Sequence, residues 1–256
     1  MNKTCLIVLV GMLAVGWSPA AAQPPGYSSD DAVNAPRVNE NVRIAMVWGE
    51  QLRPPSGYPQ AIINLKEAMM KWANTPVSIE RQLKIGSSDL MKLSVVFITT
   101  DQQFQLTDTE RRNLRDYVAR GGLIVVDNAA ANMPNSQASA SLLQMVKDIA
   151  GSKNLEPIPN THQIYQAPFK LGGPPQGSDI ALTQVGVAGV SPDGSKSLES
   201  KVMTSETSSL QGVFISGRLA ILFSNKGYTA KWNSFSNDAQ LKFGVNLITY
   251  ALSQKR

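Results

Sequence analysis

Three residues whose side chains can cooperate in hydrolysis occur in the chain: Asp127, His162 and Ser224. His162 is the only imidazole, and as a general base it needs a nucleophile and an orienting carboxylate, which Ser224 and Asp127 could supply. The sequence has no Gly-x-Ser-x-Gly elbow, and Ser224 ends an expected strand without the strand-to-helix turn that exposes such a serine. Two interpretations of His162 follow, a catalytic base and a structural histidine that fixes its own loop.

Asp127 directly follows the apolar run 123–126. A carboxylate at the end of a buried strand is partly desolvated and needs a partner. One interpretation makes Asp127 a general base or a ligand anchor. The other makes it a cap of the next turn, a common role of aspartate.

Polar or aromatic residues also follow other expected strands. Ligands of open α/β sheets bind beyond the carboxyl ends of the strands. His162 lies on a long irregular segment, 152–180, that could fold across these ends. The candidate ligand-binding residues are therefore Trp48, Gly49, Thr100, Asp101, Asp127, Asn128, His162, Ser224 and Asn225.

Two tryptophans near expected loop ends, Trp48 and Trp232, have two interpretations. Each could stack on a sugar ring or on a side chain of a partner. Each could instead be partly buried in the core, as large aromatic side chains usually are.

Several chemistries are excluded by composition. The only cysteine, Cys5, lies in the expected signal peptide, so the mature chain has no thiolate for a nucleophile, a disulfide, a zinc site or glutamine amidotransfer. No phosphate-binding Gly-x-x-x-x-Gly-Lys-Ser/Thr loop occurs. Asp101, Asp127 and His162 lack metal-ligand spacing, so we expect neither a metal nor another cofactor.

The basic residues are dispersed. The chain has 24 Lys and Arg against 19 Asp and Glu, a net charge of +5, but no dense basic cluster. We therefore expect no nucleic-acid partner.

The N-terminus has the pattern of a secretory signal peptide. Lys3 supplies the positive charge, 6–17 is apolar, and Ala20-Ala21-Ala22 supplies the small residues of a cleavage site. We expect cleavage after Ala22 and a periplasmic or secreted location. No later apolar run approaches the ~20 residues that a membrane span requires, so we expect no transmembrane segment in the mature chain. Residues 23–41, rich in Pro, Ser, Asn and Asp, read as a flexible leader.

Strand and helix patterns alternate from residue 42 onward. Gly244 in the last expected helix allows a close approach to the sheet. Alternation of this kind predicts an α/β, doubly wound, mostly parallel sheet, here with an antiparallel C-terminal hairpin edge, in one domain over 42–253. The expected strands are 42–47, 77–79, 95–98, 123–126, 213–215 and 219–223, and the expected helices are 61–72, 107–120, 139–150 and 241–252.

Several segments together resemble the bacterial exported family called domain of unknown function 4159. They are the words Leu-Thr-Asp-Thr-Glu (106–110) and Arg-Gly-Gly-Leu-Ile-Val-Val-Asp (120–127), the histidine after a proline-bearing loop (158–162), and the segments 217–224 and 244–252. The resemblance covers 42–252. It implies a flavodoxin-like, or class I glutamine-amidotransferase-like, architecture and assigns no activity.

The sequence therefore leaves two functions open. The first is an exported, non-catalytic module that binds a small molecule, a glycan or a cell-envelope protein through the strand ends. The second is a periplasmic hydrolase or carbohydrate-active enzyme that uses Asp127 and His162. A component of a cell-envelope assembly, a third possibility, would show an exposed apolar patch away from the strand ends.

Overall fold

A mostly parallel sheet lies at the centre of the computed structural model, which describes residues 42–131, 133, 135–179, 209–234 and 237–254, and the backbone of 183–190 and 196–203. The expected signal peptide and leader, 1–41, lie outside the described residues. The described strands of this sheet follow the order β2 (Val77–Ile79), β1 (Val42–Met46), β3 (Val95–Thr100), β4 (Leu123–Asn128), β9 (Arg218–Ser224), β8 (Gln211–Ile215) and β5 (Glu156–Pro157).

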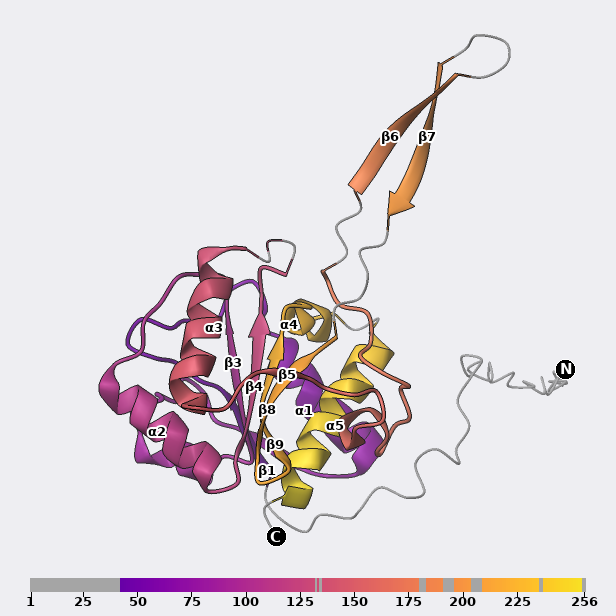
Figure 1. Cartoon of the computed structure of the whole chain (residues 1–256). Helices are drawn as coiled ribbons and strands as arrows, with labels where there is room; N and C mark the ends of the chain where they lie inside the picture. The colour runs from indigo at the N-terminus through magenta and orange to yellow at the C-terminus, as the bar shows by residue number, and fades with distance from the viewer. Residues whose placement is uncertain are drawn as a thin grey trace, which may run out of the picture.

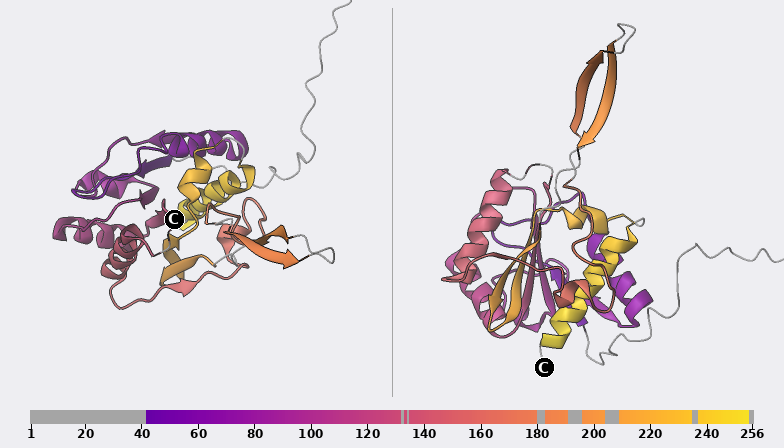
Figure 2. Two further views of the ribbon diagram at one scale, coloured as in Figure 1. Left: turned by 90° about the horizontal axis from the view of Figure 1, so that it is seen from above. Right: turned by 45° about the vertical axis from the view of Figure 1, so that its right-hand side comes forward.

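In the sheet, β2, β1, β3, β4 and β9 are parallel to their neighbours in this order. The strand β8 is antiparallel to β9, and β5 is antiparallel to β8. Helices cover both faces of this sheet (Figures 1 and 2). One face carries α1 (Ala61–Ala73), α4 (Tyr228–Trp232) and α5 (Asp238–Gln254), and the other carries α2 (Asp108–Ala119) and α3 (Gln137–Ala150). The predicted doubly wound α/β fold with an antiparallel C-terminal edge is confirmed.

The central strands β3 and β4 are buried along their whole length. Their runs of Val, Ile, Leu and Phe are typical of parallel strands that helices cover on both faces. Polar residues enter only at their carboxyl ends, at Thr99–Thr100 and Asp127–Asn128. These two strands therefore carry their polar side chains at their carboxyl ends.

A capping box fixes the start of α2, as its sequence predicts. The Thr107 hydroxyl accepts a hydrogen bond from the Glu110 N–H at 3.3 Å, and the Glu110 carboxylate accepts one from the Thr107 N–H at 2.8 Å. The same carboxylate also accepts the Glu50 N–H at 2.7 Å. Glu110 therefore ties the loop after β1 to α2.

Gly244 has a different role from the predicted one. A Cβ at this position would meet the side chain of Leu65 on α1 and approach the Trp232 indole nitrogen to 3.4 Å. The glycine thus permits the close approach of α5 to α1, and not of α5 to the sheet. The sequence pattern could not distinguish these two neighbours.

The long segment 152–180 is largely irregular over its described part, 152–179, as expected, apart from β5 and the short 3₁₀-helix η3 (Gln163–Tyr165). A second 3₁₀-helix, η2 (Ser88–Lys92), precedes β3. After this segment, β6 (Thr183–Val190) and β7 (Lys196–Met203), which the sequence analysis did not identify, form a separate antiparallel pair that stands away from the main sheet in Figure 1. Among the described helices, none combines the length and the apolar character needed to span a bilayer.

Candidate functional site

The carboxyl ends of β3, β4 and β9 meet at one edge of the sheet. The register pairs Thr100 with Asn128, and Asp127 with Ser224. These predicted site residues are therefore neighbours, as the strand-end rule requires. We call this edge, with the Asn225 that follows it, the β3–β4–β9 rim.

Asp127 is buried at the rim and holds the start of α4. Its Oδ2 accepts hydrogen bonds from the Thr229 N–H at 2.7 Å and the Thr229 hydroxyl at 2.8 Å. Burial raises the pKa of the Asp127 carboxyl, and the hydrogen bonds from Thr229 oppose this rise. The carboxylate thus caps α4, about 100 residues along the chain, and not the next turn.

The other polar side chains of the rim form hydrogen bonds with one another or with nearby backbone N–H groups. Asn128 accepts a hydrogen bond from the Ala130 N–H at 3.0 Å and donates one to Asn225 at 3.2 Å. The Ser224 hydroxyl accepts the N–H of Lys226 at 3.0 Å, and the Thr100 hydroxyl accepts that of Gln102 at 3.2 Å. Thr100, Asp127, Asn128 and Ser224 are each at most 1% exposed. The rim is therefore a closed structural network, and Asp101 beside it is exposed.

Sequence reasoning missed a buried ion pair beside the rim. Lys226 is fully buried and its Nζ lies 3.2 Å from the Asp179 carboxylate, whose side chain is 16% exposed. Asp179 lies on the segment before β6, and nothing in the local pattern around Lys226 indicates burial. Ser178 fixes that segment by donating its N–H to the Lys226 carbonyl at 2.6 Å.

His162 lies at the opposite end of the sheet from Asp127. Its ring centroid is 5.8 Å from that of Phe214 and 5.3 Å from that of Tyr250. Phe214 pairs with Leu219 near the start of β9, whereas Ser224 ends that strand five residues later. At roughly 3.3 Å per residue this is a separation of about 16 Å along the strand. The structure therefore does not assemble Asp127, His162 and Ser224 into a catalytic group.

The local contacts of His162 fit a structural role. Its Nδ1 accepts the Ile164 N–H at 3.3 Å and so caps η3. Desolvation lowers the pKa of the imidazole. Within the described residues no three His, Cys, Asp or Glu side chains cluster as metal ligands would.

Trp48 and Gly49 lie after β1, on a part of the strand ends away from the rim. The Trp48 N–H donates to the Leu83 carbonyl at 2.8 Å, and its own carbonyl accepts the Ile85 N–H at 2.8 Å. A Cβ at Gly49 would lie 2.8 Å from the Glu110 carboxylate and 3.0 Å from the Leu52 Cβ, so a larger residue there would have to displace the Glu110 side chain. The loop after β1 is thus fixed by backbone hydrogen bonds on one side and by Glu110 on the other.

Trp232, by contrast, is a core residue at 1% exposure.

Trp48 lines a cleft of about 520 Å³ at the carboxyl ends of β1 and β2, which we call the β1–β2 cleft. Its volume is within the range of small-molecule sites. Most of its lining is apolar: Met46, Trp48, Pro54, Pro55, Tyr58, Pro59, Ile62, Ile63 and Ile79. Its polar lining residues are Ser56, Glu80, Arg81 and Gln82.

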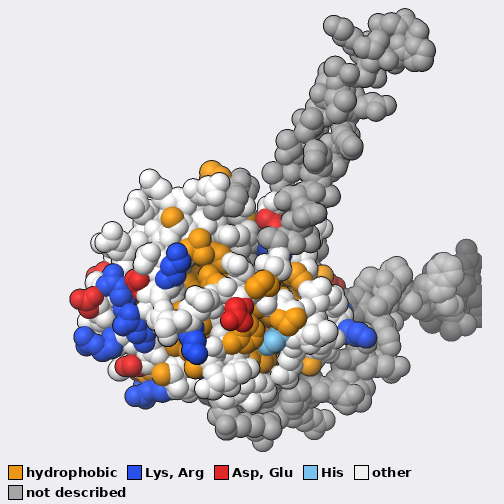
Figure 3. Space-filling view, in the orientation of Figure 1, with side chains coloured by type: hydrophobic (Ala, Val, Ile, Leu, Met, Phe, Trp, Pro, Cys, Tyr) orange, Lys and Arg blue, Asp and Glu red, His pale blue; other side chains and the backbone are white. Residues whose placement is uncertain are grey.

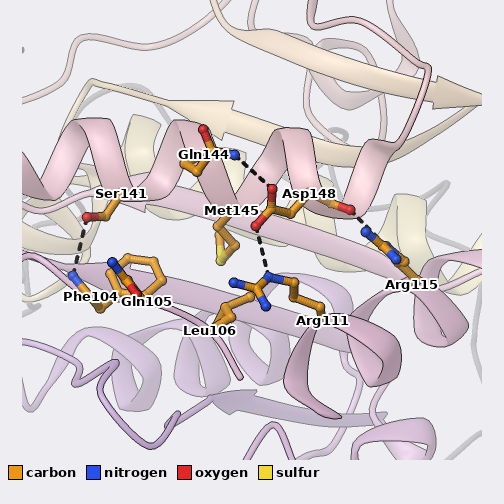
Figure 4. Close-up of a pocket in the computed structure, with 9 residues that line it drawn as sticks. All are labelled: Phe104, Gln105, Leu106, Arg111, Arg115, Ser141, Gln144, Met145 and Asp148. Atoms are coloured by element: carbon orange, nitrogen blue, oxygen red, sulfur yellow. Dashed lines mark hydrogen bonds and ion pairs between the residues drawn. The ribbon is translucent and has the colours of Figure 1, made fainter. Parts of the chain in front are cut away.

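A second hollow, of about 510 Å³, lies between α2 and α3 (Figure 4). Its polar groups bond across the helix pair. Asp148 accepts hydrogen bonds from Arg111 at 3.0 Å and Gln144 at 2.8 Å through its carboxylate, and from Arg115 at 2.8 Å through its carbonyl. Figure 3 shows Lys and Arg side chains gathered on this side of the molecule. The cluster serves to hold α2 against α3.

Comparison with known proteins supports the resemblance and adds no activity. No curated protein matches the chain. The family described as "Domain of unknown function (DUF4159)" matches residues 44–252, from within β1 to within α5, and this range includes the rim and the β1–β2 cleft. The chain therefore belongs to the DUF4159 family.

Proposed function

We propose that this protein is an exported, non-catalytic module that binds a ligand in the β1–β2 cleft. The observation that carries the proposal is the cleft itself, an apolar hollow of about 520 Å³ beside an anchored tryptophan. Its position at the carboxyl ends of parallel strands agrees with the usual place of ligands in open α/β sheets. The competing rim supports a ligand poorly, because Thr100, Asp127, Asn128 and Ser224 are almost fully buried and most of their polar atoms already take part in hydrogen bonds.

The hydrolase alternative has little support from the geometry. His162 packs against Phe214 and Tyr250, at the end of β9 far from Ser224. A general base must lie within hydrogen-bond reach of the proton that it removes, directly or through one water. Asp127 meanwhile uses Oδ2 to hold α4.

Titration of the full chain with the neutral, apolar fluorescent probe N-phenyl-1-naphthylamine tests binding in the cleft. We expect saturable binding that Trp48→Ala weakens by about tenfold, since a buried aromatic face contributes about 1–2 kcal/mol. Met70→Ala is the matched control, because Met70 is an exposed residue of α1 that does not line the cleft. Equal affinity of Trp48→Ala and wild type would remove the cleft as the site.

Export has its own test. The signal pattern at 1–22 predicts that protein recovered from outside the cytoplasm begins at Gln23. Mass spectrometry of that protein reads the N-terminus directly. A mature chain that retains Met1 would contradict the proposed location while leaving the proposed cleft intact.

A further inference from the structure

The β1–β2 cleft has an apolar interior that suits the body of a hydrophobic ligand. Met46 and Ile79 contribute from the two strands, Ile62 and Ile63 from α1, and Trp48 from the loop after β1. Burying the apolar part of a ligand against these side chains contributes roughly 25 cal/mol per Å² of surface removed from water. The charged residues of the lining, Glu80 and Arg81, directly follow β2, and we call this part of the cleft, where Arg81 is exposed, its mouth. A charge on the ligand is therefore expected at the mouth.

The carboxylates close to the mouth are already neutralised. Glu80 lines the cleft, but its Oε1 accepts the Arg43 Nε–H at 2.9 Å and lies 2.8 Å from Arg43 Nη2. Glu50, next to Gly49, pairs with Lys84 at 3.2 Å. Both ion pairs are surface pairs that leave no net negative charge at the cleft.

Two cations near the cleft have no carboxylate partner among the residues that the structure describes. Arg81 lines the mouth, is exposed, and takes part in none of the ion pairs between described residues. Arg53 lies 5.5 Å from the Trp48 ring centroid and donates hydrogen bonds only to the carbonyls of Gly49 and Leu52. The field at the mouth is therefore positive and favours an anion.

The turn that carries Arg81 is held in place. Gln82 adopts φ +53, a left-handed conformation that is uncommon for residues other than glycine. The backbone after it pairs with Trp48 through Leu83 and Ile85. Strained backbone of this kind persists only where the surrounding structure fixes it, and it recurs at ligand sites. Arg81 is thus presented to the cleft by a prearranged turn.

We infer that the β1–β2 cleft takes an amphipathic anion, with an apolar chain or ring system in the cleft and a carboxylate or similar head group at Arg81. The inference rests on the proposed function, because it names the ligand class of the same site. Arg81 acts as a specificity residue, and Trp48 binds the apolar body regardless of the head group.

Displacement of N-phenyl-1-naphthylamine by ligands with a common tail tests this inference. The competitors are decanoate, decan-1-ol and decyltrimethylammonium, each below its aggregation concentration, in low salt. We expect decanoate to displace the probe at about fivefold lower concentration than decan-1-ol, and decyltrimethylammonium to be the weakest. This preference for decanoate should shrink in 0.5 M NaCl, since salt screens an exposed charge.

Variants then assign the preference to Arg81. Arg81→Gln should remove the advantage of decanoate and leave decan-1-ol unchanged, and Arg81→Lys should retain most of it. Arg112→Gln, an exposed arginine on α2 at the opposite face, should behave as wild type. Equal potency of decanoate and decan-1-ol in wild type, with the probe still bound through Trp48, would overturn the inference and spare the proposed function. If wild type did not bind the probe at all, both the inference and the proposed function would be overturned.

A final experiment distinguishes a free anionic ligand from an anionic membrane surface. Phosphatidylglycerol vesicles present anionic head groups whose tails are not available to a cleft of this size. The chain has a net charge of +5, so we expect any cosedimentation with these vesicles at low salt to be the same for wild type and Arg81→Gln. Cosedimentation that Arg81→Gln abolishes would show that Arg81 recognises a lipid surface and would overturn the assignment of the anion to the cleft.

Discussion

Asp127 illustrates how a buried carboxylate with a raised pKa can serve the fold. Its Oδ2 holds Thr229 at the start of α4, and its Oδ1 is buried without a hydrogen-bond partner among the described residues. Perturbed pKa values cluster at functional sites, but structural networks produce them as well. The hydrogen bonds of Asp127 place it in the second class.

The raised pKa of Asp127 predicts a pH-dependent stability. A carboxyl whose pKa is higher in the folded state stabilises the fold fully below its unfolded pKa and loses this contribution as pH rises through the folded pKa. Asp127→Asn keeps the shape and removes the titration. We therefore expect the free energy of unfolding of wild type, relative to Asp127→Asn, to fall as the pH rises above about 4, the ordinary pKa of an aspartate.

Urea denaturation of both proteins across this range measures the difference. Asp101→Asn is the matched control, since Asp101 follows the neighbouring strand but is exposed. A constant difference between wild type and Asp127→Asn would mean that the carboxyl keeps its ordinary pKa in the folded protein.

Lys226 gives a second prediction for a single residue. Its Nζ is fully buried against Asp179, so Lys226→Met leaves a carboxylate with little solvent and without its cation. Removing one partner of a buried pair costs about 3 kcal/mol. The double variant Lys226→Met, Asp179→Asn should recover at least half of that loss in urea denaturation. Equal stability of Lys226→Met and the double variant would contradict a penalty from the unpaired Asp179 carboxylate.

At the scale of elements, the contact of α1 with α5 depends on Gly244. Gly244→Ala adds a methyl group where the buried side chain of Leu65 already lies, and overpacking of this kind costs about 1–3 kcal/mol. Gly86→Ala should change stability by less than about 0.5 kcal/mol, because nothing lies within 4 Å of the added atom.

Thermal unfolding compares the two glycine variants. If the cost arises from Leu65, then Leu65→Ala combined with Gly244→Ala should cost less than the sum of the single changes. Additive costs would contradict the role that we assign to Gly244.

Elements could be predicted from the sequence because their signals are local. The apolar runs 95–98 and 123–126 predict buried parallel strands, and Thr107 with Glu110 predicts the start of α2. Contacts between distant segments carry no such signal. Asp127 meets Thr229 102 residues away, and Lys226 meets Asp179 47 residues away.

The candidate site was predicted only in part for the same reason. The strand-end rule correctly placed Thr100, Asp127, Asn128 and Ser224 together. It could not show that α4 and the segment before β6 close over them, nor that the loop of His162 packs at the other end of β9. The cleft beside Trp48 could not be predicted from the sequence, because residues of other segments, such as Tyr58 and Arg81, complete its lining.

At the scale of the whole molecule, the strand ends divide into a closed part and an open part. The β3–β4–β9 rim is closed by α4 and by its own hydrogen bonds, whereas the β1–β2 cleft is hollow and lined by apolar side chains. We therefore propose that a ligand binds at the open part, while the closed part maintains the sheet.

Two-dimensional ¹H–¹⁵N NMR of the full chain, titrated with N-phenyl-1-naphthylamine, tests this location directly. We expect the perturbed amides to gather at residues 46–63 and 79–82, around Trp48, while those of Thr99, Asp127 and Thr229 keep their positions. Perturbations that centre on Asp127, Asn128 and Thr229 and spare Trp48 would contradict it.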